Sequence, residues 1–84
     1  MNDTFIERRA QTRRRVFKHG TLALGNGGSI DCTVRNISPV GAGIDVASTI
    51  GLPPSFTLTI ETDHLVRHCQ AVWTNDRRVG VAFD

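Results

Sequence analysis

Apolar and polar residues alternate along most of this chain, and a period of two is typical of β-strands that bury one face. Residues 29–35 illustrate the pattern, because Ile30, Cys32 and Val34 alternate with polar side chains. The alternation is most regular over residues 55–61. The segments with strand character are 21–24, 29–35, 42–46, 55–61, 65–73 and 79–83. The hydrophobic pattern therefore predicts an all-β domain with six short strands.

Turn-forming residues separate these segments. Residues 25–28, with the sequence Gly-Asn-Gly-Gly, are a strong hairpin signal. Residues 36–41 and 51–54 each combine proline with glycine, and no helical periodicity follows residue 15. Because a closed sheet has no exposed edge, six short strands with turns between them favour a small six-stranded antiparallel barrel, closed or nearly closed.

Residues 1–15 lack this alternation and are polar and basic. The net charge is only +2, yet five of the nine arginines fall in this segment: Arg8, Arg9, Arg13, Arg14 and Arg15. Mutual repulsion and few apolar groups predict a flexible or partly ordered N-terminal arm over residues 1–15, ahead of a barrel domain over residues 16–84. The clustered guanidinium groups indicate an anionic partner, because they pair bidentately with phosphate.

The composition excludes several classes of protein. Hydrophobic residues make up 39% and charged residues 21% of the 84 residues, as in a globular domain. No run approaches the roughly 18 apolar residues that a membrane span needs. The N-terminus has no apolar segment of the kind that a secretory signal contains. We therefore expect a cytoplasmic protein without a membrane span.

Residue types that often carry catalysis or bind metals show no such pattern here. Cys32 and Cys69 lie far apart within strand-like runs, so we expect two buried, reduced thiols. His64 and His68 are four residues apart in a predicted strand, a spacing of about 13 Å, and we expect no metal site. The chain has no nucleophile–base arrangement, paired carboxylates at a turn, or phosphate-binding glycine loop ahead of a helix. We expect neither an enzyme nor a cofactor.

Two short motifs stand out along the chain. Residues 8–13 have the pattern R-R-x-x-x-R, and residues 36–41 have the pattern N-x-S-x-x-G at a turn between strands. Together with the strand that holds Trp73 and the Gly-Val-Ala-Phe ending at residues 80–83, they resemble a minimal, stand-alone PilZ domain. The resemblance implies a six-stranded barrel that binds cyclic di-GMP and catalyses no reaction.

The resemblance also implies which residues bind the ligand. The implied set is Arg8, Arg9, Arg13, Asn36, Ser38 and Gly41, with Arg14 and Trp73 as further candidates. Arg9 and Arg13 are the matched arginines, able to hold phosphate or the O6 and N7 atoms of guanine. Arg8 takes a lesser role. The alternative for these arginines is a solvated basic arm.

The second motif supplies uncharged polar groups. Asn36 and Ser38 can offer donors and acceptors to guanine or phosphate, or they can simply cap the turn. Asn36 stands where many family members carry Asp, so only its carbonyl oxygen can accept from guanine. Gly41 provides a positive φ, room for the ligand, or turn geometry alone. Trp73 is either an anchor in the core or a ring at the rim of the site.

Two other functions fit parts of the sequence. A small β-barrel with a basic arm could bind nucleic acid, although aromatic residues for stacking are few, with four Phe, one Trp and no Tyr. A PilZ-like domain could also be an adaptor that binds no ligand. The two intact motifs favour a cyclic di-GMP receptor whose arm changes conformation on binding and signals to a downstream protein that the sequence does not identify.

Overall fold

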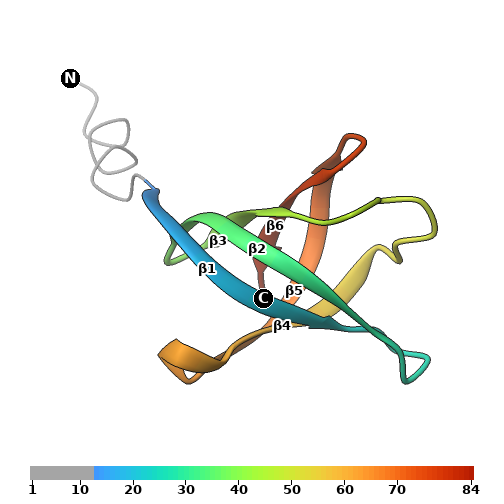
Figure 1. Ribbon diagram of the computed structural model, residues 1–84, viewed down its shortest axis with the longest axis horizontal. Coiled ribbons are helices and arrows are strands. Elements are labelled where there is room, and N and C mark those ends of the chain that lie inside the picture. The colour runs from blue at the N-terminus through green and yellow to red at the C-terminus, as the bar shows by residue number, and fades with distance from the viewer. Residues whose placement is uncertain (1–12) are drawn as a thin grey trace.

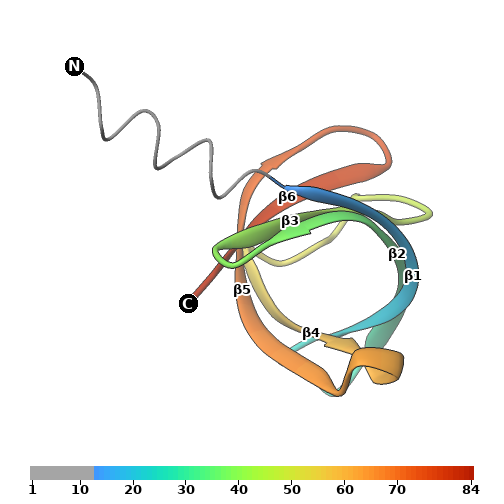
Figure 2. The same cartoon turned by 90° about the vertical axis from the view of Figure 1, so that its left-hand side faces the viewer.

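The computed structural model describes residues 13–84, which form a closed barrel of six antiparallel strands (Figure 1). The strands are β1 (Arg14–Ala23), β2 (Ser29–Ser38), β3 (Gly41–Asp45), β4 (Ser55–Ile60), β5 (Leu65–Thr74) and β6 (Arg78–Phe83). Their order around the barrel is β1-β2-β3-β6-β5-β4, and β1 pairs with β4 to close the ring, which Figure 2 shows from one end. The predicted all-β, six-stranded antiparallel barrel is confirmed.

The described residues begin just ahead of β1, so most of the predicted arm, including Arg8 and Arg9, lies outside them. β1 starts at Arg14, two residues before the barrel was expected to begin. Arg14 and Arg15 are therefore part of the first strand, and Arg13 is the one arginine of the R-R-x-x-x-R motif that the structure describes.

The turns follow the sequence signals. Between β1 and β2, Gly27 adopts a φ of 93°, which residues with a side chain rarely adopt. Asn26 stabilises this hairpin, because its side-chain oxygen accepts a 2.8 Å hydrogen bond from the N–H of Gly28. Between β4 and β5 the chain makes a short 3-10 helix, η1 (Glu61–Asp63). No helix within residues 13–84 is long and apolar enough to cross a membrane.

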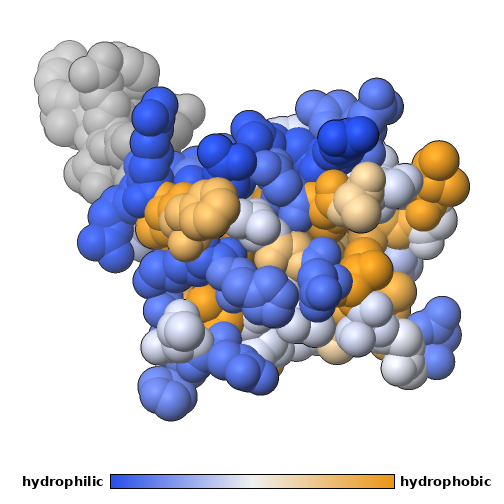
Figure 3. Space-filling view, in the orientation of Figure 1, coloured by the Kyte–Doolittle hydropathy of each residue, from blue (hydrophilic) through white to orange (hydrophobic). Residues whose placement is uncertain are grey.

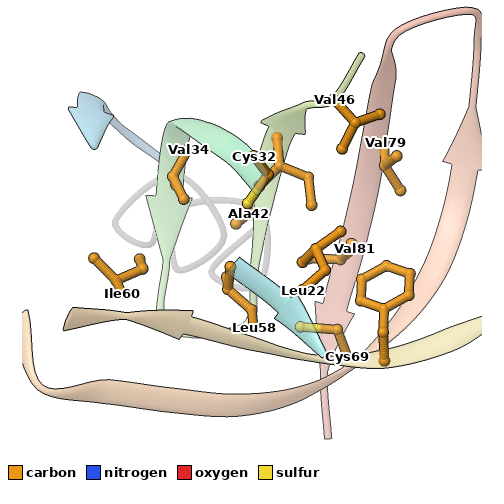
Figure 4. Close-up of a cluster of buried hydrophobic side chains, with 12 residues drawn as sticks. Leu22, Cys32, Val34, Ala42, Val46, Leu58, Ile60, Cys69, Val79 and Val81 are labelled. Atoms are coloured by element: carbon orange, nitrogen blue, oxygen red, sulfur yellow. The ribbon is translucent and has the colours of Figure 1, made fainter. Parts of the chain in front are cut away.

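Alternate side chains of all six strands meet inside the barrel and form one core (Figure 4). The largest fully buried side chains are those of Leu22, Val34, Ile44, Leu58, Ile60, Cys69 and Val79. Cys32 and Cys69 are both buried and free, as expected. Burial raises the pKa of the Cys32 thiol to about 12 and that of Cys69 to about 11, so neither thiol is reactive near neutral pH.

A β-bulge in β2 decides which residues of the second motif face outward. Val34 pairs with Ile44 inside the barrel, and after a register shift Asn36 pairs with Gly43. A bulge adds one residue to a strand, so the alternation of inward and outward side chains moves by one position. Gly43 lies between the core residues Ala42 and Ile44 and is therefore on the outer face, and so is the side chain of Asn36.

Gly41 lies directly against the backbone of β6. It pairs with Ala82, and a Cβ atom at Gly41 would overlap the carbonyl oxygen of Val81. The obstacle is backbone, which cannot rotate away as a side chain can. The φ angle of Gly41 is not positive, so the expectation of a positive φ is wrong. Glycine is needed here because two strands meet without room for a side chain.

We predict that Gly41→Ala lowers the free energy of unfolding by about 1–3 kcal/mol, the usual cost of forcing a methyl group into a filled space. Urea unfolding followed by the fluorescence of Trp73 would measure this change. Gly25→Ala is the matched control, because a Cβ there meets nothing within 4 Å, and its effect should stay within about 1 kcal/mol. Equal midpoints for the two variants would contradict the steric argument.

Candidate functional site

One row of residues crosses five strands on the outer face of the barrel. Arg15 pairs with Asn36, Asn36 with Gly43, Gly43 with Gly80, and Gly80 with Trp73. The two central positions have no side chains of their own. The amide of Asn36 lies over Gly43, and the indole of Trp73 lies over Gly80. The two glycines therefore leave space on the outer face that the amide of Asn36 and the indole of Trp73 occupy.

Asn36 carries the most unusual polar atom of this row. Its side-chain oxygen is buried and has no hydrogen-bond partner within residues 13–84. An acceptor that is buried without a donor costs about 1–3 kcal/mol, and most buried polar groups in proteins are paired. This oxygen would gain a hydrogen bond if the amide turned outward and met a donor from outside the barrel.

A hollow of about 430 Å³ opens beside Asn36 on the outer face. Its lining residues are Arg15, Val16, Phe17, Arg35, Asn36 and Arg78. Three of these six residues are arginines, drawn from β1, β2 and β6. Figure 3 shows the face over β1 and β2, where hydrophilic side chains dominate and a few apolar ones lie between them. The hollow is thus an arginine-lined site next to an unpaired acceptor.

The aspartate of β3 joins two of these arginines. Arg78 donates to Asp45 from Nε at 2.6 Å and from Nη2 at 3.3 Å, and Arg35 donates from Nη1 at 2.9 Å. The hydrogen bond from Arg78, followed by that from Arg35, holds the pKa of the Asp45 carboxyl below its usual value. The guanidinium of Arg35 also lies 5.4 Å from the centre of the Phe17 ring. Arg35, Asp45 and Arg78 all lie outside the two sequence motifs.

Ser38 stabilises the turn that follows it. Its hydroxyl accepts a 3.2 Å hydrogen bond from the N–H of Val40 and lies 3.4 Å from the carbonyl oxygen of Gly41, to which it can donate. The turn-capping alternative therefore accounts for Ser38, and the close approach of β6 accounts for Gly41. Of the second motif, Asn36 alone keeps a buried group without a partner within the described residues.

Trp73 is not a core anchor. Trp73 is 43% exposed and lies on the outer face of β5. The interpretation of Trp73 as a core residue is wrong, because the bulge between Ala71 and Trp73 turns the indole outward. The ring shares the outer row with Asn36 and lies beyond Gly43 and Gly80.

Arg14 and Arg15 lie on opposite sides of β1. Arg14 pairs with Ile37 of the barrel interior and lines a second hollow of about 520 Å³, together with Lys18 and Arg67. Arg15 lines the outer hollow with Asn36. Because side chains alternate along a strand, Arg13 is expected on the same side as Arg15, and the structure places it exposed just ahead of β1. The structure thus brings Arg15 to Asn36 in place of the candidate Arg14.

Within residues 13–84, no three His, Cys, Asp or Glu side chains gather as a metal site would require. The groups that do gather are cationic donors, one amide acceptor and exposed aromatic rings. Such a set can bind a planar, anionic molecule through charge, hydrogen bonds and stacking.

Comparison with known proteins agrees with this geometry. The model of the PilZ domain matches residues 7–84, a span that includes both motifs and the whole barrel. A search of curated proteins finds no similar sequence. PilZ domains in general bind cyclic di-GMP and act as receptors rather than as enzymes. Since the match covers nearly the whole chain, this chain belongs to the PilZ domain family.

Proposed function

We propose that this chain is a receptor for cyclic di-GMP, which lies against the outer face of β2 and β3 while the N-terminal arginines close over it. The observation that carries the proposal is the unpaired side-chain oxygen of Asn36 beside a hollow lined by three arginines. Cyclic di-GMP offers guanine N–H donors for this oxygen and two phosphates for the arginines. The family match supports the same ligand.

The arginines of the first motif complete the site in this proposal. Arg13 comes two residues before Arg15, so an extended chain would carry its side chain toward the outer hollow. Arg8 and Arg9 lie outside the described residues, and we propose that they reach the ligand from the arm. The exposed indole of Trp73 offers a flat face on which a base can stack.

Binding would signal through the arm. A segment with several arginines and few apolar groups gains little from packing, and fixing its backbone costs about 1–2 kcal/mol per residue. A ligand with two negative charges supplies the missing counter-charge, so we propose that residues 1–13 become ordered when it binds. The ordered arm would create a new surface for a downstream protein. We place the receptor in the cytoplasm, because a nucleotide second messenger is an intracellular signal.

Calorimetric titration should show that cyclic di-GMP binds more tightly than cyclic di-AMP, because adenine lacks the N1–H and 2-amino donors that guanine offers to the oxygen of Asn36. It should also bind more tightly than GTP, which has only one guanine. Asn36→Ala should weaken binding by about 1–3 kcal/mol and leave the fold at least as stable, since it removes a buried unpaired acceptor. Equal binding of cyclic di-AMP would contradict the guanine assignment. Tight, strongly salt-dependent binding of a short RNA would favour a nucleic-acid-binding module instead.

Arg9→Ala and Arg13→Ala should each weaken cyclic di-GMP binding by about 2 kcal/mol, because a charge-assisted contact is lost. Arg77→Ala is the matched control, since Arg77 is exposed in the turn before β6 and lies outside the outer hollow. It removes the same charge and should bind as wild type does. If all three variants weaken binding equally, only the net charge matters and the proposed contacts of Arg9 and Arg13 are wrong.

Trypsin should cut the free protein rapidly after Arg8, Arg9 and Arg13, and saturating cyclic di-GMP should slow these cuts at least several-fold. Cleavage after Arg67, which is exposed on β5 and lies outside the outer hollow, serves as an internal reference and should not change with ligand. Gel or mass-spectrometric analysis would follow each site. Arm cleavage at the same rate with and without bound ligand would exclude ordering of the arm while leaving binding intact.

A further inference from the structure

Arg35 and Arg78 belong to neither of the two motifs, yet both line the outer hollow beside Asn36. They reach it from distant parts of the chain, Arg35 from the bulged part of β2 and Arg78 from the first position of β6. Asp45, at the end of β3, lies between them and pairs with Arg78 in the sheet register. One carboxylate therefore holds two guanidinium groups at the wall of a cationic hollow.

The contacts leave most of each guanidinium free. Arg78 meets Asp45 side-on, through Nε at 2.6 Å and Nη2 at 3.3 Å, which is a bidentate arrangement. Arg35 uses one N–H of Nη1, at 2.9 Å, and lies over the Phe17 ring. A guanidinium has five N–H donors. The remaining donors of both arginines are available to an anion in the hollow.

Holding the two side chains in place favours binding for an entropic reason. An arginine side chain has many rotamers, and a ligand that fixes the side chain must remove part of this conformational entropy. Asp45 and the Phe17 ring restrict Arg35 and Arg78 before any ligand arrives. The charges also match, since Arg15, Arg35 and Arg78 with Asp45 leave two positive charges, against the two negative charges of the proposed ligand.

We infer that Asp45 is a positioning residue that holds Arg35 and Arg78 as a second pair of phosphate-binding arginines, in addition to those of the N-terminal motif. The inference rests on the proposed function for the identity of the ligand, but the geometry of the arginines is independent of it. The lowered pKa of Asp45 means that the carboxylate stays charged at neutral pH and keeps both contacts.

Charge alone and positioning by Asp45 predict opposite changes in ligand affinity when the carboxylate is removed. Removing a negative charge beside an anion site should tighten binding if only the charge matters. If Asp45 positions the arginines, its loss frees both side chains and should weaken binding. Asp45→Asn changes the charge with little change in size, so the direction of its effect distinguishes the two explanations.

Calorimetric titration with cyclic di-GMP should show that Asp45→Asn binds about tenfold more weakly than wild type, the effect of about 1.4 kcal/mol from freeing two side chains. Asp63→Asn is the matched control. It also removes one carboxylate charge and breaks an exposed ion pair, that of Asp63 with Lys18, but Asp63 lies outside the outer hollow. It should bind as wild type does, or slightly more tightly. Binding of Asp45→Asn equal to or tighter than that of Asp63→Asn would overturn the inference.

A second set of variants tests the route through the arginines. In a protein that carries Arg35→Ala and Arg78→Ala, the further change Asp45→Asn should no longer weaken binding, because there is nothing left to position. If it still weakens binding tenfold, Asp45 acts otherwise and the inference fails. The Arg35→Ala, Arg78→Ala double variant should itself bind more weakly than a control double variant, Arg67→Ala with Arg77→Ala. The control also removes two positive charges, but both lie outside the outer hollow.

A measurement on the free protein separates this inference from the proposed ligand. In nitrogen-15 NMR, the Nε–H groups of Arg35 and Arg78 should be restricted in wild type and mobile in Asp45→Asn, and equal mobility in both would overturn the inference. If wild type does not bind cyclic di-GMP, the proposed function fails, and inorganic pyrophosphate becomes the probe. Weaker pyrophosphate binding by Asp45→Asn than by Asp63→Asn would then support positioning, and equal, tighter or absent binding would refute it.

Discussion

The pairing of β3 with β6 is the interaction on which the rest of this structure depends. It joins residues 41–45 to residues 78–82, with Gly41 opposite Ala82 and Asp45 opposite Arg78. Without it the barrel would open into a single six-stranded sheet in the order β3-β2-β1-β4-β5-β6, with exposed edges at β3 and β6. With it the barrel closes, and the buried residues of all six strands share one interior. The same pairing brings Asp45 to Arg78 and Gly43 to Gly80, so it builds the outer site as well as the core.

The outer row from Arg15 to Trp73 contains features that lower the stability of the fold. A small domain buries only a modest share of its surface and has little free energy to spare. Two glycines in the middle of strands and a buried acceptor without a donor both lower that stability. Departures of this kind tend to collect at functional sites, where a ligand supplies the missing contact. The row that holds Asn36 and Trp73 combines both departures, which supports the site proposed there.

β1 separates two environments that both contain arginine. Arg15 faces the outer hollow, whereas Arg14 faces the open end of the barrel, where Lys18 forms a 2.7 Å ion pair with Asp63. The strand that borders the proposed ligand site therefore also borders the second hollow. A ligand that fixes the chain just ahead of β1 would act on both sides of this strand. The division follows from the alternation of side chains and needs no movement of the strand.

The sequence by itself determined the fold class, the number of strands and the positions of the turns. Alternation in 29–35 and 55–61 reports directly which side chains are buried, and the hairpin at residues 25–28 depends on local backbone preferences. The motifs at residues 8–13 and 36–41 indicated the family through a resemblance that the match over residues 7–84 supports. All of these signals are carried by residues that are close together along the chain.

Tertiary structure alone decided which of these residues meet. Arg35 and Asp45 are ten residues apart across a predicted turn, so their contact could have been inferred from the hairpin register. The contact of Asp45 with Arg78 spans 33 residues and exists only because β3 pairs with β6. Bulges moved Asn36 and Trp73 to the outer face, against a reading of Trp73 as core. A hydrophobic pattern indicates whether a side chain is buried, whereas strand partners and bulges depend on the whole barrel. For this reason the pairing of Arg35 and Arg78 with Asp45 could not be predicted from the sequence.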